Sequence, residues 1–133
     1  MPELVFVLTL IALLSIVGIH ALHGHLDRVA TRDAVRAAGL LAARARDEAV
    51  AQHTPVSFRI DTARATLDLI ARGNSFGRVA LGSENNVLLS ANRDSITFDV
   101  RGLGYGAANL TLVAKRGASS DTLVISRLGR VRY

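Results

Sequence analysis

The stretch Leu4-Val-Phe-Val-Leu-Thr-Leu-Ile-Ala-Leu-Leu-Ser-Ile-Val-Gly-Ile-His-Ala-Leu22 decides the organisation of this chain. It is apolar almost throughout, contains no Lys, Arg, Asp or Glu, and follows directly after Glu3. A helix rises by ~1.5 Å per residue, so this run is just long enough to cross a hydrocarbon layer of ~30 Å. The sequence therefore predicts a single membrane-spanning helix, and we assign residues 1–25 to it.

A secretory signal peptide is the alternative explanation for such a run. The apolar core of a signal peptide spans only ~7–15 residues and ends at a cleavage site of small residues. The end of this run, His20-Ala21-Leu22-His23, offers no such site. The sequence therefore favours a permanent anchor over a cleaved signal.

A second helical pattern extends from Leu26 to Gln52. Apolar residues recur there at spacings of three and four and form one stripe: Val35, Ala38, Leu41, Ala42, Ala45 and Ala49. Charged residues fall largely outside it: Arg32, Arg36, Arg46 and Asp47. Because small side chains let a sheet approach the helix backbone, we expect this stripe to pack on one. Gly39 costs about 1 kcal/mol relative to Ala in a helix, which indicates tight packing or a mild bend, and Thr54-Pro55 ends the helix.

Beyond Pro55 the hydrophobic period changes from that of a helix to that of a strand. Alternation predicts strands at Val56–Ile60, Ala65–Ala71, Val79–Leu81, Val87–Ser90, Ser95–Val100 and 110–114, and a last hairpin that includes Leu123, Ile125 and Val131. We expect loops at residues 73–77 and 115–121. The segment Gly102–Gly106 precedes a strand, so we interpret it as a strand connection and not as a phosphate-binding loop. The expected fold class is α+β: one long N-terminal helix packed on a small antiparallel sheet, whole or split in two, with residues 26–133 forming the head.

Arginine dominates the charge of this chain. The formal net charge is +5, from 16 Lys and Arg against 11 Asp and Glu, and Lys115 is the only lysine. Because a guanidinium pairs bidentately with phosphate and carboxylate groups, this composition fits an anionic partner. A coding bias that enriches Arg and Ala explains the same composition without any partner.

The residue types needed for catalysis or metal binding form no recognisable set. The chain has no Cys, which excludes disulfides and thiolate metal sites, and its serines lie outside any nucleophile motif. His20 and His23 can share a helix face whereas His25 points elsewhere, so we interpret them as interfacial polar residues rather than zinc ligands. The sequence therefore predicts no enzyme, no cofactor, no metal site and no small-molecule substrate.

Segments at both ends of the chain carry a resemblance to a known family. Pro2-Glu3-Leu4 and the apolar run resemble the N-terminal segment of type IV pilins and type II secretion pseudopilins. Ser95-Ile96-Thr97-Phe98-Asp99, Gly102 and Gly129-Arg130-Val131-Arg132 resemble the GspH/FimT branch of minor pilins. The resemblance implies a type IV pilin-like fold and a structural subunit of a filament, partnered by other pilins or pseudopilins. It also implies a single-pass anchor in the inner membrane with the C-terminal head in the periplasm.

The resemblance gives Glu3 a specific role. In the family this carboxylate is the fifth residue after a leader that prepilin peptidase removes, and it pairs with the N-terminal amine of a neighbouring subunit during assembly. Met1 stands where the third mature residue belongs, so we expect a basic leader with a prepilin peptidase site upstream of it. Without such a leader, Arg28, Arg32 and Arg36 would keep the head in the cytoplasm. The alternative for Glu3 is a carboxylate that rests in the headgroup layer without a function.

The C-terminal Gly129-Arg130-Val131-Arg132-Tyr133 is the second candidate site. In an extended segment Arg130 and Arg132 project to one face, ~6–7 Å apart, which is near the spacing of successive phosphates. Tyr133 adds an aromatic ring that can stack on a base. Four further cations are candidates for a wider basic patch: Arg101, Lys115, Arg116 and Arg127.

Two functions follow from this C-terminal segment. It resembles the Gly-Arg-x-Arg motif with which FimT-like minor pilins capture DNA, which implies a DNA-binding pilus subunit near the filament tip. A Gly-Arg turn also occurs in secretion pseudopilins as a simple hairpin end, which implies a tip subunit for protein export without DNA binding. A third possibility, a periplasmic binding domain on a membrane anchor, explains the span and the strands but not Glu3.

Overall fold

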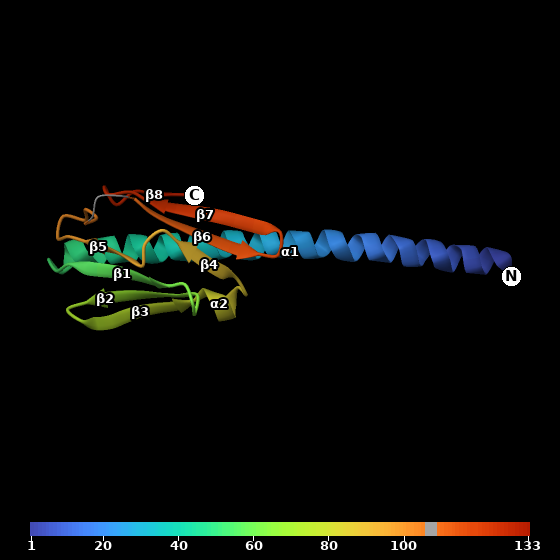
Figure 1. Ribbon diagram of the computed structural model, residues 1–133, viewed down its shortest axis with the longest axis horizontal. Coiled ribbons are helices and arrows are strands. Elements are labelled where there is room, and N and C mark those ends of the chain that lie inside the picture. The colour runs from blue at the N-terminus through green and yellow to red at the C-terminus, as the bar shows by residue number, and fades with distance from the viewer. Residues whose placement is uncertain (106–108) are drawn as a thin grey trace.

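The computed structural model describes residues 1–105 and 109–133 and is built on one long helix, α1 (Pro2–Ala51). Short strands pack against the C-terminal half of α1 and form the head with it, while the N-terminal half projects as a stalk (Figure 1). The helix ends where expected, since Gln52 is its C-cap, His53 has a positive φ of 48°, and Pro55 follows. The chain therefore has the α+β architecture that the sequence predicts.

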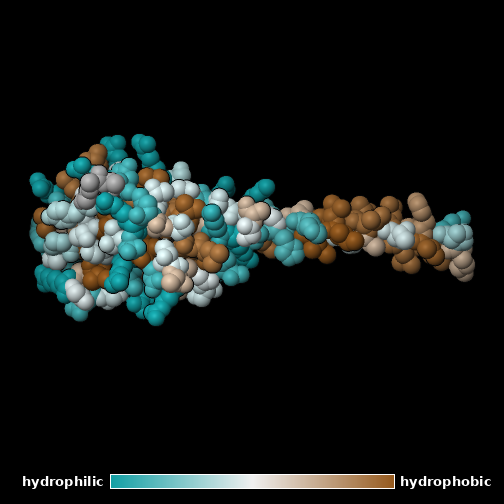
Figure 2. All heavy atoms as spheres, viewed as in Figure 1, coloured by the Kyte–Doolittle hydropathy of each residue, from teal (hydrophilic) through white to brown (hydrophobic). Residues whose placement is uncertain are grey.

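The stalk is an exposed apolar rod. Every residue from Met1 to Leu26 is exposed, and an 18-residue window has a mean hydropathy of 2.6 with none of it buried (Figure 2). Its hydroxyl groups are satisfied within the helix, because Thr9 Oγ1 donates to Phe6 O at 2.7 Å and Ser15 Oγ donates to Ile11 O at 2.8 Å. This rod is long and apolar enough to cross a membrane, and it exposes far more apolar surface than a soluble monomer tolerates.

Two antiparallel sheets pack on the second half of α1. The first has the order β3-β2-β1-β5 and consists of β1 (Val56–Asp61), β2 (Thr66–Ala71), β3 (Asn74–Ala80) and β5 (Ser95–Phe98). The second has the order β4-β6-β7-β8 and consists of β4 (Leu88–Ala91), β6 (Leu110–Arg116), β7 (Ser119–Ile125) and β8 (Val131–Arg132). A short helix, α2 (Leu81–Glu84), follows β3. The sheet is thus split in two, which is one of the two arrangements expected.

One buried core joins α1 to both sheets. The predicted stripe of α1 is buried throughout: Val35, Ala38, Leu41, Ala42, Ala45 and Ala49. Alternate strand residues cover it: Phe58, Leu67, Leu69 and Phe98 from the first sheet, and Leu110, Leu112, Leu123 and Ile125 from the second. Burial of each large apolar side chain stabilises the fold by about 1.5–3 kcal/mol. The predicted inward face of the helix is confirmed.

The loop predicted over residues 73–77 is wrong, because most of that segment belongs to β3. Arg72 and Gly73, with φ of 51° and 81°, form a two-residue turn whose positive φ values match the twist of a hairpin. Pairing with β2 begins at once, with Asn74 opposite Ala71. Residues of β3 are exposed or only half-buried, so the strand carries no alternating apolar signal.

Strand boundaries also differ from the prediction elsewhere: β1, β2 and β4 each differ by one residue at one end or both, and the larger differences are the following. The turn predicted over 115–121 is shorter, because β6 continues to Arg116 and β7 starts at Ser119. The strand predicted over 79–81 ends one residue early, since Leu81 begins α2. The strand predicted over Ser95–Val100 ends at Phe98, and Val100 is 39 % exposed beyond the end of β5. Residues 102–105 follow β5 as part of a connection, as expected, and Gly106 lies outside the described residues.

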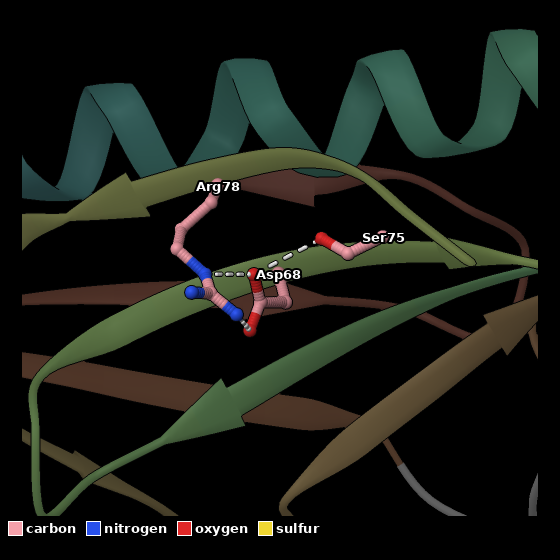
Figure 3. A network of polar contacts seen from close by, with 3 residues as sticks. All are labelled: Asp68, Ser75 and Arg78. Carbon is pink, nitrogen blue, oxygen red and sulfur yellow. Dashed lines mark hydrogen bonds and ion pairs between the residues drawn. The ribbon is translucent and has the colours of Figure 1, made fainter. Parts of the chain in front are cut away.

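A polar network holds the outer strand β3 to β2 (Figure 3). Arg78 lies opposite Asp68 in the register and pairs with it through two nitrogens, with Nε–Oδ1 at 2.6 Å and Nη2–Oδ2 at 3.1 Å. Ser75 Oγ donates a third, longer hydrogen bond to Asp68 Oδ1 at 3.4 Å. The hydrogen bonds from Arg78 are the main reason that the pKa of Asp68 lies below its ordinary value. This pair fixes the register of the hairpin at its most exposed edge.

Candidate functional site

The turn that precedes β8 lies toward the end of the head that is farthest from the stalk, which we call the distal end, and β8 runs back from it along the head (Figure 1). A tight turn carries it: the Gly129 N–H donates to Ser126 O at 2.9 Å, and the Ser126 N–H donates to Arg130 O at 2.8 Å. The Arg130 N–H also donates to Ser126 Oγ at 3.1 Å. The two residues of β8 then pair with β7, Val131 opposite Ile125. The sequence Gly-Arg-x-Arg therefore spans a turn and the first residues of an edge strand.

Arg130 and Arg132 share one face of this segment. Both are exposed, whereas Val131 between them is half-buried and packs against the core. The two arginines line a hollow of about 240 Å³ together with Asn109, Val124, Ser126 and Leu128. The alternation predicted from the sequence is thus present, and both arginines contribute to the lining of one hollow.

A junction of two glycines and one arginine fixes the turn. Gly129 has a φ of 73°, and a methyl group there would come 2.6 Å from Gly102 O and 3.0 Å from Arg46 Cδ. Gly102 has a φ of 77°, and a methyl group there would come 2.9 Å from Arg46 Nε. Arg46 Nη1 also donates a long hydrogen bond to Gly129 O at 3.5 Å. The turn therefore requires glycine for reasons of conformation and space, independently of any ligand.

Asp99 shapes the loop that supplies Gly102. Its Oδ1 accepts hydrogen bonds from the N–H groups of Arg101 and Leu103, both at 2.9 Å. The Asp99 N–H donates to Leu103 O at 2.8 Å, which closes the loop. The hydrogen bond from Leu103 is the chief reason that the pKa of Asp99 lies below its ordinary value, with the Arg101 N–H and charge adding to it. Asp99, noted in the sequence only as part of a resemblance, thus organises the distal end.

Tyr133 lies across α1 at Gly39. Its hydroxyl group and ring edge occupy the space that a side chain at position 39 would fill, which explains the glycine in the middle of a helix. The expected tight packing at Gly39 is present, with the C-terminal residue as the partner. Tyr133 remains 67 % exposed, so much of its surface is open to solvent.

The wider basic patch is only half right. Arg101 and Arg127 lie at the distal end, where Arg101 pairs with Asp99 at 3.6 Å and Arg127 lines a second hollow beside Leu128. Lys115 and Arg116 lie at the opposite end, where β6 meets the stalk side of the head (Figure 1). There Arg116 Nε pairs with Asp27 Oδ1 at 3.0 Å. The order of residues along the chain could not reveal this, because β6 runs toward the stalk and carries these cations away from the motif.

Glu3 lies at the other extreme of the molecule, exposed in the first turn of α1. A carboxylate there is favoured by the positive end of the helix dipole. The stalk histidines are engaged locally, since His20 Nδ1 and His23 Nδ1 lie 3.2 Å and 2.8 Å from the carbonyl oxygens of Ile16 and Ile19. Within residues 1–105 and 109–133, three or more His, Cys, Asp or Glu side chains nowhere gather as a metal site would require.

Comparison with known proteins identifies the fold and the family. FimU, a type IV minor pilin of Pseudomonas aeruginosa PAO1, matches with a TM-score of 0.66 at 18 % identity, over 80 % of this chain and 89 % of FimU. EpsH, a minor pseudopilin of the type 2 secretion system of Vibrio cholerae, matches with a TM-score of 0.63 at 12 % identity, over 77 % of this chain and 94 % of EpsH. No curated protein sequence matches significantly. The model of the family described as type II transport protein GspH matches residues 34–129, well over half of the chain, so this protein belongs to the GspH family of minor pilins and pseudopilins.

Proposed function

We propose that this chain is a minor pilin, near the tip of a type IV pilus, that binds DNA without sequence preference through Arg130 and Arg132. It acts as a structural subunit, not as an enzyme, with the stalk anchored in the inner membrane and the head in the periplasm. One observation carries the proposal: both arginines line a single hollow, beside the turn and strand β8 in the half of the head that lies away from the stalk. A long polyanion can reach this end while the stalk stays in the membrane or the filament.

The chemistry of the hollow supports a phosphate backbone as the ligand. Two guanidinium groups on one face can each pair with a phosphate oxygen, and the rigid turn at Gly129 holds the first of them in place. Ser126 and Asn109 add neutral polar groups to the same hollow. The exposed part of Tyr133 is available to stack on a base. Contacts to phosphate oxygens carry no sequence information, so binding of this kind has no sequence preference.

The test is DNA binding by the full chain in detergent, measured by fluorescence anisotropy over a range of salt concentrations. We expect a Kd of ~10⁻⁴ to 10⁻⁶ M, because few phosphate contacts release few counterions. Arg130→Gln with Arg132→Gln should remove most of the affinity and make the salt slope shallower by about two units. Arg44→Gln with Arg59→Gln removes the same charge from exposed positions outside the hollow and should leave the slope near that of the wild type.

A tip subunit of a type II secretion filament without DNA binding is the second candidate. The description of the matching family and the likeness to EpsH favour it. In that case Arg130 and Arg132 are solvated charges beside an edge strand, and the turn at Gly129 serves only the fold. A wild-type chain that shows no salt-dependent DNA binding at high protein concentration would make this the preferred function.

For Glu3 we propose a role in assembly, through a positively charged group of the neighbouring subunit. A carboxylate at the end of an apolar stalk is costly to leave unpaired in lipid. A filament in which a neighbouring subunit pairs with Glu3 removes this cost, which favours the correct arrangement of the subunits. Glu3→Ala should leave membrane abundance unchanged and lower the amount of protein in sheared filaments. Equal incorporation of mutant and wild type would remove Glu3 from the mechanism.

A further inference from the structure

We propose that a row of arginines where α1 leaves the stalk binds the phosphate groups of anionic phospholipids, in the bilayer that the stalk crosses. Arg28, Arg32 and Arg36 follow one another at every fourth position, so they form one line on the helix surface. All three are exposed. They line a shallow hollow of about 420 Å³ together with His25, Val29 and Asp33.

This row lies on the side of α1 that the sheets leave uncovered. The residues of the same stretch that are buried against the head are Ala30, Thr31, Ala34 and Val35. The row is therefore open to a partner outside the head. In Figure 2 hydrophilic surface gathers where the head meets the stalk, next to the apolar rod. The cationic row and the membrane-spanning surface are thus continuous along one helix.

The height of the row above the bilayer suits lipid phosphates. If the apolar run ends at Leu22, Arg28 lies about 9 Å and Arg32 about 15 Å farther along the axis, at ~1.5 Å per residue. The headgroup layer extends ~5–8 Å beyond the hydrocarbon core. Side chains of a helix tilt toward its N-terminus, which here is the membrane side, and a long arginine stem can extend the reach. Arg28 and Arg32 therefore reach the phosphates, and Arg36 strengthens the field.

The local charge balance leaves the row cationic. Asp33 is the one carboxylate that lines the hollow. The nearest other carboxylate along α1, Asp27, is held by Arg116 of β6 at 3.0 Å. Within the described part of the chain, the ion pairs found involve none of Arg28, Arg32 and Arg36. Three guanidinium groups against one carboxylate make an anionic surface the complementary partner.

The experiment uses the full chain reconstituted in phosphatidylcholine vesicles. Traces of spin-labelled phosphatidylglycerol or phosphatidylcholine are added, and electron paramagnetic resonance gives the fraction of each lipid that the protein immobilises. We expect phosphatidylglycerol to associate at least about fivefold more strongly than phosphatidylcholine. A single cation near an anionic membrane surface contributes about 1 kcal/mol of binding free energy, which corresponds to this factor. At ~1 M salt, where the Debye length is ~3 Å, the preference should shrink.

Three variants separate charge from structure. Arg28→Gln, Arg32→Gln and Arg36→Gln together should bring the preference close to one, whereas the same three positions changed to Lys should keep it. A control removes three exposed arginines of the head, Arg44→Gln, Arg59→Gln and Arg72→Gln, and should retain the wild-type preference. Circular dichroism verifies that each variant is folded.

Two outcomes overturn the proposal. One is a wild-type chain with no preference for phosphatidylglycerol. The other is a triple Gln variant, folded as the wild type is, that keeps the full preference. If the wild type shows no lipid preference and the triple Gln variant fails to enter filaments, the row binds an acidic neighbouring subunit instead. None of these results depends on whether the distal end binds DNA.

Discussion

The two halves of α1 share one continuous backbone and differ in the size of their apolar side chains. The stalk half carries Leu, Ile, Val and Phe on all sides, and all of it is exposed. The head half carries a stripe of mostly alanine, and that stripe is buried. The more hydrophobic half is thus the one that packs on nothing within the described chain. The half that packs is the one with small side chains, because these let two sheets approach the helix backbone.

The glycines of α1 repeat this contrast. Gly18 and Gly24 in the stalk have open space where a side chain would be. Gly39 in the head half is covered by Tyr133. A glycine in the stalk therefore weakens the helix with no packing gain within the chain, whereas a glycine in the head makes room for a contact. The stability of the isolated molecule should accordingly reside in the head.

The largest effect should come from a charge on the buried stripe. Ala42 is 1 % exposed, so Ala42→Glu would bury an unpaired carboxylate at a cost of several kcal/mol, a large part of the ~5–15 kcal/mol that holds a domain together. We expect loss of the cooperative thermal transition of the head, monitored by circular dichroism. Ala43→Glu, one position away on the exposed side, is the control. An unchanged midpoint for Ala42→Glu would mean that the other helix face is inward.

A smaller effect should come from the glycine junction at the distal end. Gly129→Ala or Gly102→Ala adds a methyl group within 3.0 Å of neighbouring atoms at a positive φ, and should destabilise the head by about 1–3 kcal/mol. Gly18→Ala and Gly24→Ala in the stalk should be neutral or favour the helix by up to about 1 kcal/mol. Denaturant unfolding compares the four variants. Equal changes in unfolding free energy for the stalk and head variants would contradict the difference between the two halves of the molecule.

The sequence was sufficient for those elements whose apolar residues recur with a clear period. The stripe from Val35 to Ala49 and the alternation in β1, β2, β6 and β7 each report one buried face, and each was predicted. The first part of β3 was not predicted because its residues are mostly exposed, and the tight turn before it places Arg72, a residue type with no turn preference, at a positive φ. A strand without a buried face has no alternating apolar pattern from which it could be predicted.

The candidate site, too, was predicted only in the part that depends on local sequence spacing. Alternation within residues 130–132 was enough to place two arginines on one face. The contact of Arg46 with Gly102 and Gly129 joins residues far apart in the chain, and no local pattern encodes it. The same holds for Tyr133 on Gly39, where the sequence indicated tight packing but not its partner. Local spacing predicts which side chains share a face, whereas contacts between distant segments require the fold.

A still smaller effect on the free energy of unfolding should appear at acidic pH. Since the folded-state pKa of Asp99 lies below its unfolded value, its contribution to stability is present above about pH 4 and is lost as the pH falls through the folded-state value. Unfolding free energy should therefore decrease as the pH is lowered below about 4. Asp99→Asn should make this decrease shallower, leaving the part due to Asp68, whose pKa is lowered by Arg78. An identical pH dependence in Asp99→Asn and wild type would contradict the role of Asp99.

The most direct test of the contrast is the removal of residues 1–25. The first buried position of α1 is Ala30, and its ion pair with the head involves Asp27, so the deletion keeps all buried positions of α1 and this ion pair. We expect residues 26–133 to be a soluble monomer with a thermal midpoint close to that of the head in the full chain. The full chain should partition into membranes, and the shortened chain should not. A shortened chain that fails to fold, or unfolds at a much lower temperature, would contradict the claim that the head is stable without the stalk.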